Sequence, residues 1–345
     1  MCARLLIHVG DYKTGSTSIQ TCLSEGLWRC ETHSLAYPCA NPHHMVLAKA
    51  MRLRKPDPAR DDLFRQTAQA VRNADADTVV LSAEHFQGVR PARLLKWVET
   101  YLPEMADDMC VLAYVRPHAE FTLSLYAERV KLGATTDPID TYLPRFLEND
   151  RIRFAPRFMR WRRVFGDRFI LRPVVAPLLA GGDALNDFLN IALEGHAFEL
   201  NQGHLRSNPS LSAEDLWFMR HVHARISELR PDLDKADRRR FGNALYSVLS
   251  DKGPSGTPLG LTSDQIALVQ DSCNEDARAM DRAFFPEGAL APALAEADKL
   301  SCPDLGAPTD HVSARQRLAL LRSWPKFMRS ASEADGLLAG LVFGS

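Results

Sequence analysis

Short, continuous apolar runs alternate with segments of helical periodicity in the first half of the chain. Apolar residues recur with the spacing of a helix in the ranges 16–29, 45–52, 61–73, 91–101 and 117–132. The apolar runs lie at 5–9, 78–81, 110–115 and 168–175, the last of them interrupted by Pro173. Strands that are buried on both faces read as unbroken apolar runs. The alternation therefore predicts an α/β fold in three layers, with a mainly parallel sheet flanked by helices.

The strand signal ends at about residue 183, and amphipathic helical patterns follow it. We expect helices at 183–193, 212–229, 234–249 and 262–283, with a loop at 251–260. After Pro286 the pattern weakens, and only 314–321 has helical spacing. The chain is therefore predicted to form one α/β domain over 1–285, with a helical extension from about 183. A helical and partly irregular tail is predicted over 286–345.

Composition excludes several classes of protein. The 345 residues are 46% hydrophobic, and 42 Lys and Arg balance 43 Asp and Glu, for a net charge of −1. A packed core is expected, and the absence of a basic excess argues against a nucleic-acid partner. Seven cysteines without a C-x-x-C pair predict buried, reduced thiols rather than a zinc ribbon. No apolar stretch approaches the roughly 20 residues of a membrane span. We expect a cytoplasmic protein without a metal site.

One segment departs from the overall charge balance. Residues 145–172 contain nine Arg against Glu148, Asp150 and Asp167. The spacing indicates a helix with an Arg-rich face. That face is either solvated or a binding surface for an acidic saccharide.

The loop after the first predicted strand carries the strongest chemical signal. It reads Gly10-Asp11-Tyr12-Lys13-Thr14-Gly15-Ser16-Thr17 and leads into a helix. Such a loop directs backbone N–H groups and a helix N-terminus at one point, which predicts an anion site. It is not a Walker A motif, because Ser16 occupies the place of the Lys that follows the second Gly. No clear Walker B acid follows either.

Polar residues also follow the next two predicted strands. Arg116 directly follows the run 110–115, and Ser124 lies eight residues later on a predicted helix. This pair could bind one phosphate group. Glu84 lies three residues after the run 78–81, where a carboxylate could accept a proton from a nucleophile.

These segments resemble the signatures of sulfotransferases that use 3′-phosphoadenosine 5′-phosphosulfate (PAPS). The run from Lys13 to Thr17 is similar to their 5′-phosphosulfate loop, although many members have Pro where this chain has Tyr12. Arg116 with Ser124 is similar to their second signature. The resemblance implies a P-loop-like fold. It also implies that Lys13 bridges the phosphosulfate, that Thr14, Gly15, Ser16 and Thr17 bind the 5′ end, and that Arg116 and Ser124 bind the 3′-phosphate.

The resemblance also indicates a base and an acceptor region. The ending Ser82-Ala83-Glu84 is similar to carbohydrate-type and related bacterial sulfotransferases, in which a Glu is the base. Other branches use a His, so His85, His43 and His44 are alternatives, with His44 expected near the acceptor. In many bacterial members an Arg/Asn/Ser segment closes over the nucleotide, which would place Arg206 or Asn208 near the cofactor.

The expected reaction is transfer of the sulfuryl group of PAPS to a hydroxyl or amine. The acceptor would be a small molecule, a saccharide or a lipid, and the setting a bacterial cytosol. Two other functions stay open, namely a P-loop kinase-like phosphotransferase and a non-catalytic nucleotide-binding protein.

Overall fold

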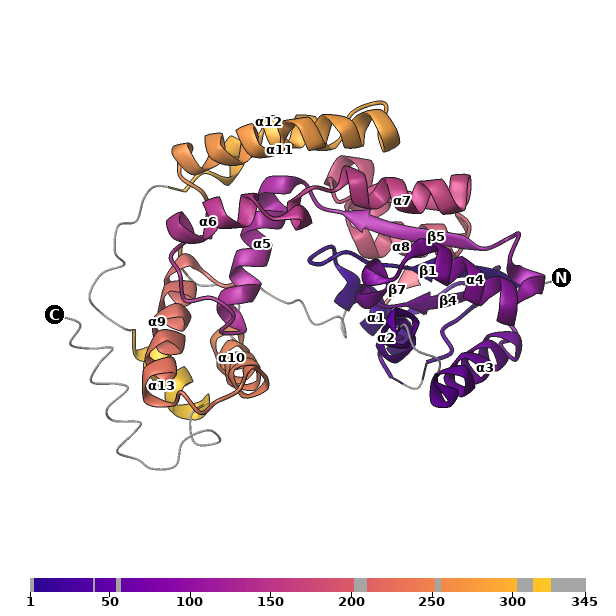
Figure 1. Ribbon diagram of the computed structural model, residues 1–345, viewed down its shortest axis with the longest axis horizontal. Helices are drawn as coiled ribbons and strands as arrows, with labels where there is room; N and C mark the ends of the chain where they lie inside the picture. The colour runs from indigo at the N-terminus through magenta and orange to yellow at the C-terminus, as the bar shows by residue number, and fades with distance from the viewer. Residues whose placement is uncertain are drawn as a thin grey trace. The chain divides into compact units, whose positions relative to one another are not determined.

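The chain folds into two compact units whose segments alternate along the sequence. The computed structural model describes residues 3–39, 41–53, 57–201, 210–251, 256–302 and 313–323 (Figure 1). The first unit comprises Met1–Pro117, Arg153–Ser207 and Asn274–Leu294, and the second comprises His118–Ile152, Asn208–Cys273 and Ala295–Ser345. The boundary predicted at 285/286 rests on the pattern along the chain and stays a prediction.

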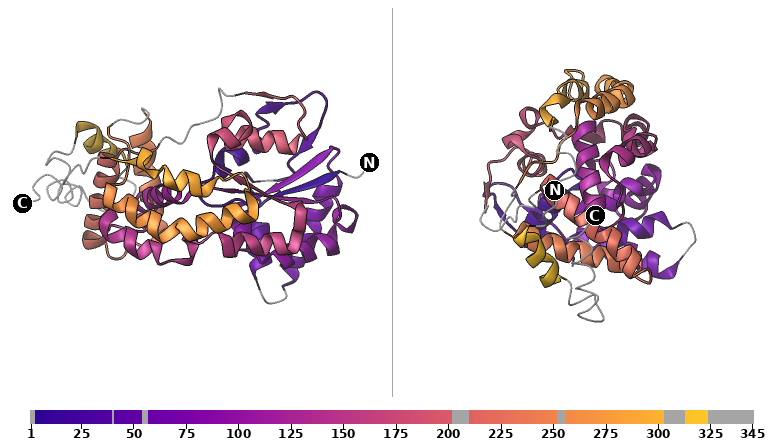
Figure 2. Two further views of the ribbon diagram at one scale, coloured as in Figure 1. Left: turned by 90° about the horizontal axis from the view of Figure 1, so that it is seen from above. Right: turned by 90° about the vertical axis from the view of Figure 1, so that its left-hand side faces the viewer.

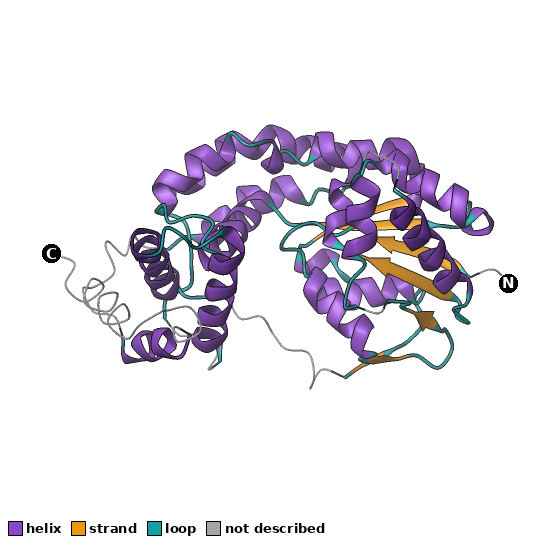
Figure 3. Ribbon diagram, turned by 60° about the horizontal axis from the view of Figure 1, so that its bottom comes forward, coloured by secondary structure: helices purple, strands orange, loops and turns teal. Residues whose placement is uncertain are grey.

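The first unit is built on a five-stranded parallel sheet, drawn in orange in Figure 3. Its strand order is β3 (Leu35–Ala36), β4 (Thr78–Ser82), β1 (Arg4–His8), β5 (Cys110–Val115) and β6 (Phe169–Pro173). The four predicted strands are confirmed within one or two residues at each end. The two-residue strand β3 was not predicted. Neither was the antiparallel pair of β2 (Trp28–Arg29) and β7 (Glu199–Leu200).

Helices flank this sheet on both sides (Figure 2). They are α1 (Ser16–Glu25), α2 (Met45–Arg52), α3 (Pro58–Arg72), α4 (Pro91–Tyr101), α7 (Ala155–Phe165) and α8 (Ala184–Ala192). The predicted helix 16–29 was too long. Gly26 takes a left-handed conformation at φ 62°, and its N–H bonds the Cys22 carbonyl, which ends α1 at Glu25.

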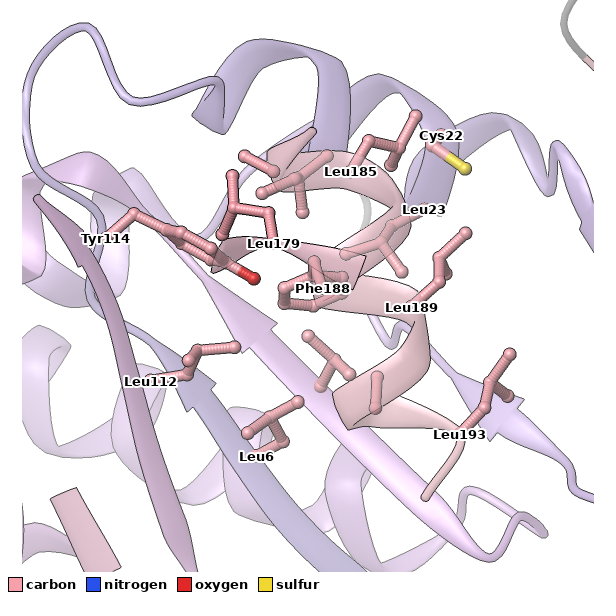
Figure 4. Close-up of a cluster of buried hydrophobic side chains, with 14 of the residues drawn as sticks. Leu6, Cys22, Leu23, Leu112, Tyr114, Leu179, Leu185, Phe188, Leu189 and Leu193 are labelled. Atoms are coloured by element: carbon pink, nitrogen blue, oxygen red, sulfur yellow. The ribbon is translucent and has the colours of Figure 1, made fainter. Parts of the chain in front are cut away.

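Burial of both sheet faces explains the continuous apolar runs. On one face, Leu6 and Tyr114 of the sheet pack against Leu23 of α1 and Phe188 of α8 (Figure 4). Leu5 and Ile7 alternate with Leu6 along β1 and are also fully buried. Successive strand residues point to opposite faces, so helices must cover both faces of this sheet.

The second unit is helical. It contains α5 (His118–Lys131), α6 (Ile139–Leu147), α9 (Ala213–Leu229), α10 (Lys235–Ser250) and α13 (Ala314–Ser323). The division between the units falls inside α11 (Ser263–Phe284), and α12 (Leu290–Ala295) follows it. The helices predicted at 212–229, 234–249, 262–283 and 314–321 are confirmed. Ser212 caps α9 by accepting a hydrogen bond from the Asp215 N–H. No helix in the described segments is long and apolar enough to cross a membrane.

Candidate functional site

Three strand ends meet at one edge of the sheet. β1 lies between β4 and β5, and His8 is level with Ser82 on one side and Leu112 on the other. In open parallel sheets, ligands bind at the carboxyl ends of the strands, where the connections diverge. The segments that follow β1, β4 and β5 therefore form the candidate site, and each of them carries residues predicted from the sequence.

The loop between β1 and α1 turns sharply. Gly10 has φ 36°, Lys13 has φ 64° and Gly15 has φ 92°. Lys13 is one of two non-glycine residues with positive φ in the described chain, the other being Glu194. A left-handed conformation costs a side-chain-bearing residue about 1 kcal/mol or more, so the surroundings must hold it. The glycines were predicted from the sequence, but the strained backbone at Lys13 was not.

Helix α1 begins at this loop with an open N-terminus. Its N-cap residue is Gly15, no side chain caps it, and its first turn contains no acidic residue. The Ser16 hydroxyl is 1% exposed and has no hydrogen-bond partner in the described part of the chain. Unpaired N–H groups and the helix dipole favour an anion here. Thr17 is exposed on the next position of the same turn.

The Thr14 side chain bonds within the loop, and the binding of a 5′-phosphosulfate by Thr14 stays a prediction. Its buried hydroxyl donates a 2.9 Å hydrogen bond to the Asp11 carbonyl. The side chain therefore closes the loop on itself, and its hydroxyl proton is used within the loop.

The carboxylate of Asp11 is buried under the loop at 1% exposure. Arg157 of α7 binds both of its oxygens, with Nη2–Oδ2 at 2.6 Å and Nη1–Oδ1 at 3.0 Å. The Tyr12 N–H donates to Oδ1 at 2.8 Å. A buried carboxylate needs such a partner, because desolvation of an isolated charge costs several kcal/mol. The pair also neutralises a negative charge where an anion is expected.

The same guanidinium contacts the segment after β4. Arg157 Nη1 donates a 3.1 Å hydrogen bond to Gln87 Oε1. Gln87 belongs to the 3₁₀ turn η1 (Glu84–Gly88), which begins with the predicted base. Sequence reasoning missed Asp11, Gln87 and Arg157. The available signals were the Arg-rich run and an acid placed next to a loop glycine.

Glu84 lies against the loop. A Cβ atom on Gly10 would stand 2.9 Å from Ser16 Oγ and 3.2 Å from Glu84 Cα. The structure thus brings together Gly10, Ser16 and Glu84, which the sequence predicted separately. Only glycine fits between the other two without displacing them.

A buried polar network lies beneath the loop. His8 Nδ1 and Ser82 Oγ are 2.8 Å apart, and Gln20 Nε2 donates to the same hydroxyl at 3.1 Å. Burial lowers the pKa of His8 to about 3, so its ring is neutral near pH 7. The network joins β1, α1 and β4 below the site, and it was not predicted.

His44 supports the end of β4. Its Nδ1 accepts a 3.1 Å hydrogen bond from the Ser82 N–H, and its Nε2 lies 3.2 Å from the Pro38 carbonyl. Burial lowers its pKa to about 4. Both ring nitrogens engage backbone groups, so His44 occupies a supporting position rather than an open one. His43 and His85 are half-buried.

The remaining predicted residues lie on other segments. Arg116 is half-buried directly after β5. Leu112 is level with His8, so Arg116 comes four residues beyond the level where β1 ends. Ser124 lies on α5 of the second unit, and its pairing with Arg116 stays a prediction. Asn208 and Arg206 lie outside the described residues.

Comparisons of the chain with protein-family models, with curated proteins and with solved structures found no match. Within the segments that the structure describes, no group of three or more His, Cys, Asp and Glu side chains could hold a metal ion.

Proposed function

We propose that this chain is a PAPS-dependent sulfotransferase with a P-loop-like fold. One arrangement carries the proposal, namely the Gly10–Ser16 loop beside Glu84, with a Ser16 hydroxyl that has no partner among the described residues. It combines an open helix N-terminus, a Lys in a constrained loop and a carboxylate at the carboxyl edge of a parallel sheet. These are the groups that sulfuryl transfer needs, because the leaving group is an anion and the nucleophile must lose a proton.

In this proposal the loop binds the 5′-phosphosulfate end of PAPS. Backbone N–H groups from Thr14 to Thr17 and the Ser16 hydroxyl donate to its oxygens. Lys13 places its ammonium on the bridging oxygen. Arg116 and Ser124 bind the 3′-phosphate, with the Arg as a bidentate donor.

The reaction is an in-line displacement at sulfur. The acceptor oxygen or nitrogen forms the new bond to sulfur, while the bond between sulfur and the bridging phosphate oxygen breaks. Glu84 takes the proton of the acceptor. Adenosine 3′,5′-bisphosphate leaves with the bond electrons, and Lys13 stabilises that negative charge.

Isothermal titration with adenosine 3′,5′-bisphosphate tests the proposal first. We expect it to bind at least tenfold more tightly than AMP, because each phosphate finds its own charged donors. Binding of ATP with Mg²⁺ in preference to the bisphosphate would instead favour a phosphotransferase. Equal affinity for AMP and the bisphosphate would contradict the proposal.

Three variants separate binding from chemistry. Lys13→Ala and Arg116→Ala should each weaken bisphosphate binding about tenfold or more, as expected for loss of a charge-assisted contact. Arg163→Ala, at an exposed position of α7, is the matched control for charge and should leave binding unchanged.

Glu84→Gln should keep bisphosphate affinity and abolish release of the bisphosphate from PAPS in the presence of sugar and amine acceptors. Liquid chromatography of the nucleotides measures that release. Full turnover in Glu84→Gln would transfer the base role to a histidine.

A further inference from the structure

A cavity lies in the first unit, on elements other than the loop. It has a volume of about 280 Å³ and is lined by the end of α2, by α3 and by α4. A cavity of about 150 Å³ accommodates one benzene ring. This one therefore has room for a bicyclic ring system.

Aromatic side chains form one part of the wall. Phe64, Trp97 and Tyr101 pack edge to face or tilted, with ring centroids 5.8–6.5 Å apart. Phe64 and Trp97 are 9% and 3% exposed. The Trp97 indole N–H is buried and has no hydrogen-bond partner in the described chain. The indole nitrogen has no accessible surface, so the wall offers a ligand the aromatic rings rather than this donor.

Cations form the other part of the wall. Arg60 pairs with Asp61 at 3.0 Å, which leaves Arg93 and Lys96 as the uncompensated charges. Arg93 Nη1 is fixed by the carbonyls of Met51, Arg52 and Leu53 at 3.2–3.3 Å. No carboxylate of the described segments pairs with Arg93 or Lys96. The cavity thus combines aromatic surface with a net positive charge.

The geometry points to a binding site for a small aromatic anion in this cavity. A flat ring system of one or two rings would contact Phe64, Trp97 and Tyr101, and a sulfonate or carboxylate group would bind Lys96 and Arg93. Aromatic contacts and a few placed polar groups are the usual composition of a small-molecule site. This site is independent of the proposed transferase activity.

Titration of the full chain with naphthalene-2-sulfonate tests the inference, with naphthalene-2-sulfonamide as the neutral analogue of the same shape. We expect the sulfonate to bind about tenfold more tightly, because a charge-assisted contact is lost with the sulfonamide. Methanesulfonate, which lacks the rings, should not bind. Equal affinity for the sulfonate and the sulfonamide, or no binding at millimolar concentration, would overturn the proposal.

Variants locate the ligand. Lys96→Gln should weaken sulfonate binding about tenfold and leave sulfonamide binding unchanged. Trp97→Phe replaces the indole by a smaller ring, and it should weaken the binding of both ligands by a few-fold. Lys49→Gln, at an exposed position of α2 outside the cavity, is the charge-matched control and should bind as the wild type does. Wild-type affinity in Lys96→Gln would refute the site.

A competition experiment keeps this inference apart from the proposed function. Saturating adenosine 3′,5′-bisphosphate should not change sulfonate affinity, and sulfonate should bind whether or not the bisphosphate does. Displacement of sulfonate by the bisphosphate would assign it to the loop and overturn this proposal. Circular dichroism and urea unfolding of Lys96→Gln should match the wild type, since no described group pairs with the Lys96 ammonium.

Discussion

Loss of the Arg157 guanidinium should destabilise the first unit and loosen the Gly10–Ser16 loop. Arg157→Met keeps the aliphatic part of the side chain and removes the guanidinium, whose carbon lies 4.8 Å from the Phe158 ring centroid. It takes the guanidinium away from the Asp11 carboxylate, which is 1% exposed and still accepts from the Tyr12 N–H.

The magnitude follows from burial. Breaking a buried ion pair by removing one partner costs about 3–5 kcal/mol. The Arg157 side chain is 18% exposed, so water can partly screen Asp11 in the variant. We therefore expect the free energy of unfolding to fall by about 3 kcal/mol, at the lower end of that range. The double variant Asp11→Asn/Arg157→Met removes the buried charge and should recover most of this loss.

Two quantities are measured for each variant. Urea unfolding, monitored by circular dichroism, gives the free energy of unfolding, and titration gives the affinity for adenosine 3′,5′-bisphosphate. The control is Arg172→Met, which breaks the 2.7 Å pair of Arg172 with Asp187 in the same unit. Asp187 keeps donors from the Tyr114 hydroxyl and the Ala180 N–H, so a smaller loss of about 2 kcal/mol is expected.

Ligand affinity distinguishes the two variants. Arg157→Met should weaken binding of the bisphosphate about tenfold, because Asp11 and Thr14 would no longer hold Lys13 in its left-handed conformation. Arg172→Met should leave affinity unchanged. A stability loss below about 1 kcal/mol in Arg157→Met, or equal loss of affinity in both variants, would refute the reasoning.

Three further predictions concern single positions. Gly10→Ala places a Cβ 2.9 Å from Ser16 Oγ at φ 36°, so it should cost about 1–3 kcal/mol in urea unfolding and abolish bisphosphate binding. Because burial lowers the pKa of His44 from 6.5 to about 4, the wild type should lose stability as pH falls through that window. His44→Asn, whose carbonyl oxygen can replace Nδ1, should lessen the loss between pH 7 and pH 4.5 by about 2 kcal/mol while retaining turnover. Gly242→Ala would bring a Cβ within contact of the Lys131 carbonyl and should lower the melting temperature by several degrees without changing bisphosphate affinity. A variant that departs from its stated direction would contradict the packing or linkage argument behind it.

Local patterns in the sequence predicted much of the first unit. The run 110–115 became β5 and 91–101 became α4 without a change of boundary, because their apolar spacing and flanking Pro residues act within one element. The loop glycines were recognised because a strand, a tight turn and a helix follow one another directly. The early end of α1 was missed, since Gly26 competes with a helical pattern that continues to Arg29.

The sequence by itself determined where four strands of the parallel sheet and the glycine-rich loop lie, and which polar residues follow three of those strands. Only the tertiary structure decided which of nine arginines meets Asp11, a partner 146 residues away, and that His44 is engaged at both ring nitrogens. The reason is physical. Backbone preferences and apolar periodicity act over a few residues, whereas the partner of a buried charge depends on which helix packs beside the loop.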